Sequence, residues 1–264
     1  MKRRDLLAGI AASAVSGSDA LAAGAAGGAS NNFLEIRTYR LHNSFEEQFS
    51  HLSDYLRSAY QPAAAHAGAK LIGAFNTYIG PDSPSLISIT QYASLGAMQG
   101  ALATLAADEK YQQQLGSLGG EAGFPYLRIE SSLLRCFDGM PEPALADPND
   151  KRPARFFEFR TYESHTLATL ARKVQMFNQG EIAIFQKVGM RPVFFGETLV
   201  GPRQPNLMYM LAFDDLAARE KLWHDFGSDP DWKKLSSQPG LSDAQVVSNI
   251  SNVMLRPLSF SLIR

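Results

Sequence analysis

The sequence places the same acidic, basic and phenolic side chains at alternate positions in two stretches of the chain. These side chains are Glu35, Arg37 and Tyr39 in the first stretch and Glu158, Arg160 and Tyr162 in the second. An arginine can hold a carboxylate through two parallel hydrogen bonds, while a glutamate orients the arginine and a tyrosine donates its hydroxyl. Both stretches therefore predict a binding site for a small anion.

The same residues also fit a structural role. Glutamate and arginine two positions apart in a strand lie on one face, where they can form an ion pair with each other or with a charged residue of a neighbouring strand. Buried ion pairs of this kind are commonly structural. Both interpretations stay open at the level of sequence.

A histidine follows each stretch at the same distance, His42 after the first and His165 after the second. Such a pair could act in acid–base chemistry or bind a metal, and we include both among the candidate ligand-binding residues. A turn residue beside the start of a helix is the simpler interpretation. Because neither lies in a recognisable ligand spacing, no metal is expected, and no catalytic residue can be named.

Each stretch has the alternation of a β-strand, so its polar face is opposed by an apolar one. Leu34 and Ile36 form the apolar face of the first stretch, and Phe157 and Phe159 form that of the second. We expect the apolar faces to lie under helices. We expect the Glu/Arg/Tyr faces to line a space enclosed between two sheets.

The surrounding sequence repeats as well. Residues 33–39, 71–79, 86–92 and 126–137 read as strands, residues 45–59 and 95–115 as helices, and the second half follows the same order. The order β-α-β-β-α-β is ferredoxin-like. The chain is therefore predicted to be an α+β protein, with two tandem ferredoxin-like domains that form a pseudo-dimer. The expected divisions are a leader (1–30), a first domain (31–137), a proline-rich linker (138–154) and a second domain (155–264).

Composition narrows the classes of function. The chain has 264 residues, of which 45% are hydrophobic, so an ordinary globular core is expected. Its net charge is −1, so no nucleic-acid partner is expected. No apolar run reaches the length of a membrane span. Cys136 is the single cysteine, which excludes an intrachain disulfide and cysteine-ligated zinc.

Several motifs resemble the NIPSNAP family of the dimeric α/β-barrel superfamily. They are the F-x-E-x-R-x-Y stretches, the glycines Gly68 and Gly189, the turns Gly80-Pro81 and Gly201-Pro202, and the helix close Asp229-Pro230-Asp231-Trp232. The first copy departs from this close at Asp108-Glu109-Lys110-Tyr111. The resemblance covers both halves and implies a dimeric α/β-barrel fold.

The resemblance implies function less directly, because the family has no agreed activity. Our first hypothesis is a protein that binds a small anionic or aromatic ligand or a protein partner. The alternative is a metal-independent, monooxygenase- or isomerase-like enzyme acting in the inter-sheet pocket. Some members of the superfamily bind haem through a histidine. No histidine of this chain falls on an evident inner position of a predicted strand. No cofactor is therefore expected, and haem is the lesser alternative. A homo-oligomer is left open.

The first 30 residues resemble a bacterial twin-arginine export signal. Arg3 and Arg4 precede an apolar run from Leu6 to Val15, and Ala20-Leu21-Ala22 offers a cleavage site. The alternative is a disordered tail that contains two arginines. The pattern predicts a periplasmic or secreted protein.

Replacing Arg3 and Arg4 with lysine should retain the precursor in the cytoplasm, because the pathway reads the arginine pair. Immunoblots of periplasmic and cytoplasmic fractions measure this. Undiminished export of the double variant would show that the pair is not a signal.

Overall fold

The computed structural model describes residues 31–43, 47–119, 123–147, 149 and 153–264. The predicted export signal lies outside these residues. The first half runs β1 (Phe33–Arg40), α1 (Gln48–Tyr55), η1 (Leu56–Tyr60), α2 (Gln61–His66), β2 (Lys70–Ile79), β3 (Ser85–Tyr92), α3 (Leu95–Ala107), α4 (Glu109–Ser117) and β4 (Arg128–Cys136).

The second half follows the same order. It runs β5 (Phe156–Glu163), α5 (Leu167–Met176), η2 (Phe177–Glu181), α6 (Ile182–Lys187), β6 (Arg191–Val200), β7 (Asn206–Phe213), α7 (Leu216–Ser228), α8 (Pro230–Ser236), α9 (Asp243–Val246) and β8 (Asn249–Pro257). Both η segments are single π-helical turns at equivalent positions.

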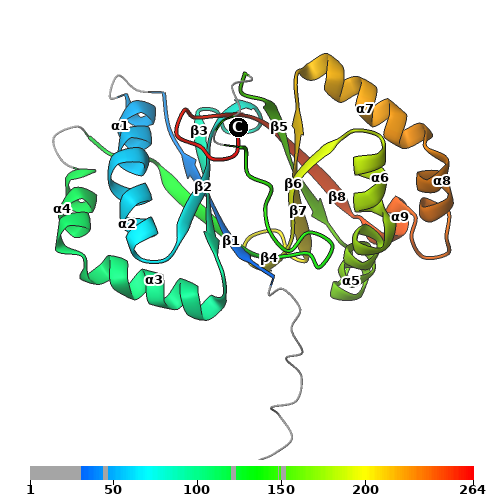
Figure 1. Ribbon diagram of the computed structural model, residues 1–264, viewed down its shortest axis with the longest axis horizontal. Helices are drawn as coiled ribbons and strands as arrows, with labels where there is room; N and C mark the ends of the chain where they lie inside the picture. Colours follow the sequence, from blue (N-terminus) through cyan, green and yellow to red (C-terminus); the bar gives the residue numbers. More distant parts are fainter. Residues whose placement is uncertain (1–30, 44–46, 120–122, 148, 150–152) are drawn as a thin grey trace, which may run out of the picture.

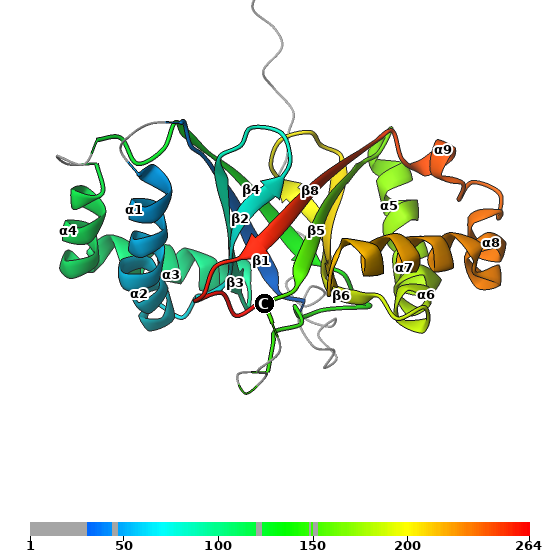
Figure 2. The ribbon, with the colours of Figure 1, turned by 90° about the horizontal axis from the view of Figure 1, so that it is seen from above.

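The strands of both halves close into one antiparallel barrel in the order β1-β3-β2-β8-β5-β7-β6-β4. Each half supplies four neighbouring strands, and the halves join where β2 pairs with β8 and β4 pairs with β6. The helices of the two halves lie on opposite sides of the barrel (Figures 1 and 2). The predicted fold class is confirmed. Among the described residues, no helix is long and apolar enough to cross a membrane.

Local sequence explains the breaks in the helices. We expect one helix over residues 95–115, but Asp108 has extended backbone and its side chain accepts a hydrogen bond from the amide of Tyr111, so it ends α3 and caps α4. Asp229 does the same between α7 and α8. Gly68 and Gly189 follow the first helical region of each half with positive φ of 81° and 89°, which favours glycine.

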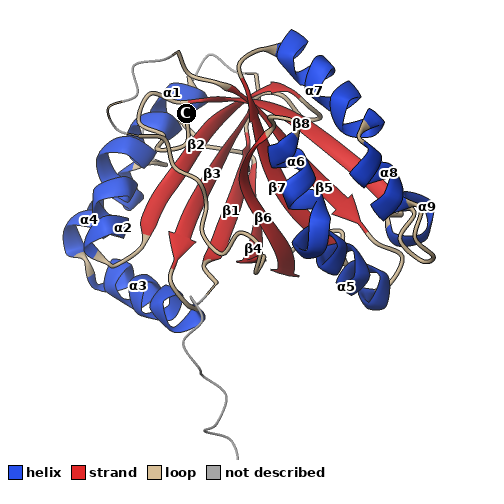
Figure 3. Ribbon diagram, turned by 45° about the vertical axis from the view of Figure 1, so that its right-hand side comes forward, coloured by secondary structure: helices blue, strands red, loops and turns tan. Residues whose placement is uncertain are grey.

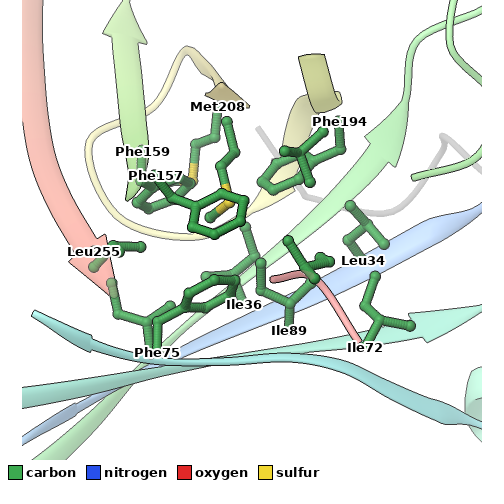
Figure 4. Packing of buried hydrophobic residues seen from close by; sticks show 14 of the residues in the cluster. Leu34, Ile36, Ile72, Phe75, Ile89, Phe157, Phe159, Phe194, Met208 and Leu255 are labelled. Carbon is green, nitrogen blue, oxygen red and sulfur yellow. The ribbon is translucent and has the colours of Figure 1, made fainter. Parts of the chain in front are cut away.

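The barrel interior is apolar. Side chains from both halves meet there, including Leu34, Ile36, Phe157 and Phe159, as Figure 4 shows. The prediction that the Glu/Arg/Tyr faces line the space between the sheets is therefore wrong. An eight-stranded barrel is just wide enough for side chains to fill it, and filling it with charged pairs would cost far more than filling it with apolar groups.

The opposite faces of the sheets lie under the helices, which form one layer on each side of the strands (Figure 3). Tyr39 belongs to the apolar cluster of the first layer, and Tyr162 to that of the second. The Glu/Arg/Tyr faces thus point into two helix–sheet layers. Any site formed by these residues is therefore duplicated, with one copy in each half.

Truncating the interior should be costly. Phe157 is 1% exposed and packs edge-on against Phe75, so Phe157→Ala should lower the free energy of unfolding by about 3–5 kcal/mol. Phe124 is 76% exposed, and Phe124→Ala should change the free energy of unfolding by no more than about 0.5 kcal/mol. Urea denaturation followed by circular dichroism measures both. Similar losses in the two variants would contradict the packing described here.

Candidate functional site

The second helix–sheet layer holds a closed network around Glu158, a fully buried residue of β5. Its carboxylate accepts hydrogen bonds from Arg160 at 2.6 Å, from Arg219 at 2.8 and 3.0 Å, and from the Trp223 indole at 2.7 Å. Burial alone would raise the pKa of Glu158, but hydrogen bonds from Arg219 and Trp223 and the charge of Arg160 bring it below its ordinary value. The carboxylate is therefore ionised and saturated with donors.

Arg160 is locked in the same network. Its guanidinium carbon lies 4.4 Å from the centre of the Trp223 ring, and its Nη2 donates to the Tyr162 hydroxyl at 3.1 Å. The hydroxyl of Tyr209 on β7 donates in turn to Tyr162 at 2.9 Å. Arg160 is only 8% exposed. A ligand could reach it only by displacing these partners.

A second buried ion pair completes this layer. Lys173 of α5 lies 2.9 Å from Glu181 in the π-helical turn η2, and both side chains are almost fully buried. Burial opposes the charge of Lys173, but Glu181 outweighs it and raises the pKa, so the ammonium stays protonated. Lys173 also lies 3.4 Å from Asp243 of α9.

Sequence reasoning missed six participants in this network: Lys173, Glu181, Tyr209, Arg219, Trp223 and Asp243. Lys173 alone carried a usable signal, because it interrupts the apolar helical period formed by Leu170, Met176 and Phe177. A charge at such a position must find a partner when the helix packs.

The first layer repeats the central pair with fewer partners. Glu35 binds Arg37 Nε at 2.8 Å and accepts a hydrogen bond from the Tyr92 hydroxyl at 3.1 Å. The Arg37 side chain is 27% exposed, and its guanidinium carbon lies 6.0 Å from the Tyr60 ring centre. Within the part of the chain that the structure describes, Glu35 is the only carboxylate paired with Arg37, and the Tyr39 hydroxyl also hydrogen-bonds the Arg37 side chain.

The two layers differ at Glu158 and Arg160, which Arg219 and Trp223 of α7 contact, and at Lys173, which α9 contacts. Val246 of α9 is fully buried, and Asp243 contacts Lys173. The corresponding described stretch of the first half, residues 123–127, contains no helix, and Phe124 and Leu127 there are 76% and 55% exposed. In the first layer, the Arg37 side chain is 27% exposed.

The remaining predicted residues lie around these networks. Tyr39 is buried and packs against Tyr126 with ring centres 5.8 Å apart. His42 is bound to Gln48, whose Nε2 lies 2.9 Å from its ring nitrogen, and exposed His165 lies 3.3 Å from the carbonyl of Ala244. Each histidine thus has partners in its own half.

The first layer places a charged arginine among neutral phenols. Burial raises the pKa of Tyr39, Tyr60 and Tyr92, so these phenols keep their protons at neutral pH. The charge of Glu35, although opposed by burial, helps to keep Arg37 protonated. No group of three or more His, Cys, Asp or Glu side chains that could hold a metal occurs among the described residues.

Because the second layer is sealed, Glu158→Ala should lower the free energy of unfolding by about 3–5 kcal/mol, since it leaves buried Arg160 without its carboxylate. Glu35→Ala should cost less than half as much, because water reaches Arg37. Urea denaturation compares the two, and equal losses would contradict the difference between the layers.

The pH dependence provides a second check. The folded-state pKa of Glu158 lies below its ordinary value of 4.5, so its stabilisation is complete above that pH and is lost as the pH falls through the folded-state pKa. The stability difference between wild type and Glu158→Gln should therefore be constant at neutral pH and shrink below pH 4.5. A constant difference through the acid range would exclude an ionised Glu158.

Comparisons with solved structures agree with the fold. A candidate monooxygenase from Lactobacillus acidophilus NCFM is 12% identical, with a TM-score of 0.54 over 86% of this chain and 94% of the other. An anthrone oxidase-like protein is also 12% identical, with a TM-score of 0.50 over 86% and 92%. A NIPSNAP-like domain protein from Burkholderia xenovorans is 23% identical over 42% of this chain and 90% of its own, with a TM-score of 0.37.

The comparison with curated proteins finds no match. The model of the NIPSNAP family matches residues 34–119 and 157–262, which include both Glu/Arg/Tyr stretches and both helix–sheet layers. The chain therefore belongs to the NIPSNAP family.

Proposed function

We propose that this protein binds a small organic anion in its first helix–sheet layer, with Arg37 as the anchoring residue. The second layer serves to hold the fold together. The observation that carries the proposal is the difference between the repeated arginines: the Arg37 side chain is 27% exposed and pairs with its carboxylate through Nε, whereas the Arg160 side chain is 10% exposed and held through both Nη groups.

The orientation of Arg37 suits a carboxylate. Glu35 occupies its Nε, so a ligand carboxylate would bind through the Nη groups, which a guanidinium can offer as two parallel donors. Glu35 is itself held by Tyr92, so the guanidinium is oriented before the ligand arrives. Such preorganisation favours binding because less conformational freedom is lost on association.

The surroundings favour an aromatic or otherwise flat ligand body. Tyr60 lies beside the guanidinium, and the partly buried rings of Tyr55 and Tyr126 belong to the same apolar cluster. Aromatic side chains offer a rigid contact surface to a planar ligand. Small aromatic carboxylates are accordingly the first compounds to test.

The export pattern at the N-terminus supports placing this activity outside the cytoplasm. In that location the protein would meet small acids before they enter the cell. This location is part of the proposal, and the arginine-pair variant described above tests it.

Arg37→Gln should weaken the binding of salicylate and of 4-hydroxybenzoate by about tenfold or more, because a charge-assisted hydrogen-bonded pair is lost. Isothermal titration calorimetry measures the affinity, and a thermal melt checks the fold. Analysis of the recovered ligand by mass spectrometry should find it unchanged, as expected for binding rather than turnover.

Arg128→Gln provides the matched control, since Arg128 is an exposed arginine of β4 that also binds a glutamate two positions away in the sequence. Its affinity for both probes should equal that of the wild type. The proposal fails if Arg37→Gln binds normally, or if Arg128→Gln loses as much affinity as Arg37→Gln.

A further inference from the structure

A separate cavity lies at one end of the barrel, where β5 and β6 begin. It has a volume of about 210 Å³ and contains none of the Glu/Arg/Tyr residues. Its lining consists of Ala144, Leu145, Ala146, Arg155, Phe157, Arg191, Pro192, Val193, Ala212, Ile263 and Arg264.

Two segments outside the regular elements build the wall of this cavity. Residues 144–146 of the linker are fixed by hydrogen bonds from the Ala144 amide to Val193 at 2.8 Å and from the Ala146 amide to Leu262 at 3.0 Å. The amides of Leu262 and Ile263 both donate to the carbonyl of Ile72 on β2. Figure 2 shows the C-terminal segment, in red, and part of the linker, in green, on the same side of the barrel.

These segments lie largely outside the two regions that match the family model, which end at residues 119 and 262. Arg155 and Arg264 also lie outside the matched regions. The cavity is thus built by the connection between the two halves and by the residues after the second half.

The lining is rich in arginine and has no acidic side chain. Arg191 Nη1 lies 2.6 Å from Asp214, and Arg155 Nε lies 3.7 Å from the same carboxylate oxygen. Asp214 is largely exposed and does not line the cavity, so the carboxylate bound to Arg191 is solvated and lies outside it. Each guanidinium has five N–H donors, which allows it to bind a second acceptor as well.

The floor of the cavity is apolar. Phe157, Val193, Ala212 and Ile263 are each at most 4% exposed and belong to the barrel interior. A dry apolar cavity of about 150 Å³ can hold benzene, so this one has room for a body of about that size with a carboxylate at the arginines.

We propose that this cavity binds a small monocarboxylate with a compact apolar body. The carboxylate lies at Arg191 and Arg155, and the body packs on Phe157 and Ile263. This site is independent of the one at Arg37, because no residue of the first helix–sheet layer lines it.

The test uses the full chain with Arg37→Gln, so that the proposed site in the first layer contributes nothing. Cyclohexanecarboxylate is titrated by calorimetry, with cyclohexylmethanol as the neutral probe of similar shape. The acid should bind, and the alcohol should bind at least about tenfold more weakly. Adding Arg191→Gln should lower the affinity for the acid by about tenfold or more.

Adding Arg135→Gln instead provides the matched control, because Arg135 is another half-exposed arginine with a single carboxylate partner, Glu197. Arg191 is itself 44% exposed, so its replacement should leave the melting temperature unchanged. Loss of all acid binding on Arg37→Gln alone, equal binding of acid and alcohol, or full affinity after Arg191→Gln would each overturn this inference. The last two results would leave the proposal for Arg37 intact.

Discussion

Closure of the barrel is the constraint on which the rest of the structure depends. Two four-stranded sheets can close only by pairing β2 with β8 and β4 with β6, and closure buries one face of every strand. That face must fill the interior without voids or unpaired charges. Leu34 and Ile36 in β1, and Phe157 and Phe159 in β5, satisfy this requirement. The charged residues between them in the sequence are consequently turned outward under the helices.

Charges placed under helices need partners, and the two halves supply them differently. The second half provides Arg219 and Trp223 from α7, a second ion pair at the π-helical turn, and α9 as a cover. Its carboxylate Glu158 accepts four hydrogen bonds, which suits a structural role because a buried pair is costly to break. In the described part of the first half, the centre consists of Glu35, Arg37 and Tyr92, with the Tyr39 hydroxyl bound to Arg37. The duplicated stretch therefore has one sealed copy and one accessible copy, and the accessible copy is where ligand binding is expected.

Sequence reasoning reached the fold because repetition and strand order are visible in the chain itself. It misjudged which strand face lies inside, since alternation defines two faces of a strand without saying what covers each. The family motif Asp229-Pro230-Asp231-Trp232 has a structural place in the second half. That motif ends one helix and starts the next, with Asp229 capping α8, and Trp232 packs in the sealed layer. Arg160 is covered by Trp223 of α7, which is distant in sequence, so no local pattern could reveal the difference in exposure between Arg37 and Arg160.

A crystal structure of the protein soaked with 4-bromobenzoate tests the central claim most directly, because anomalous scattering locates bromine without reference to any assumed site. This account predicts a bromine position in the first helix–sheet layer, with the carboxylate on the Nη groups of Arg37 and no bromine in the second layer. Bromine beside Arg160, or none beside Arg37 at saturating ligand, would contradict it.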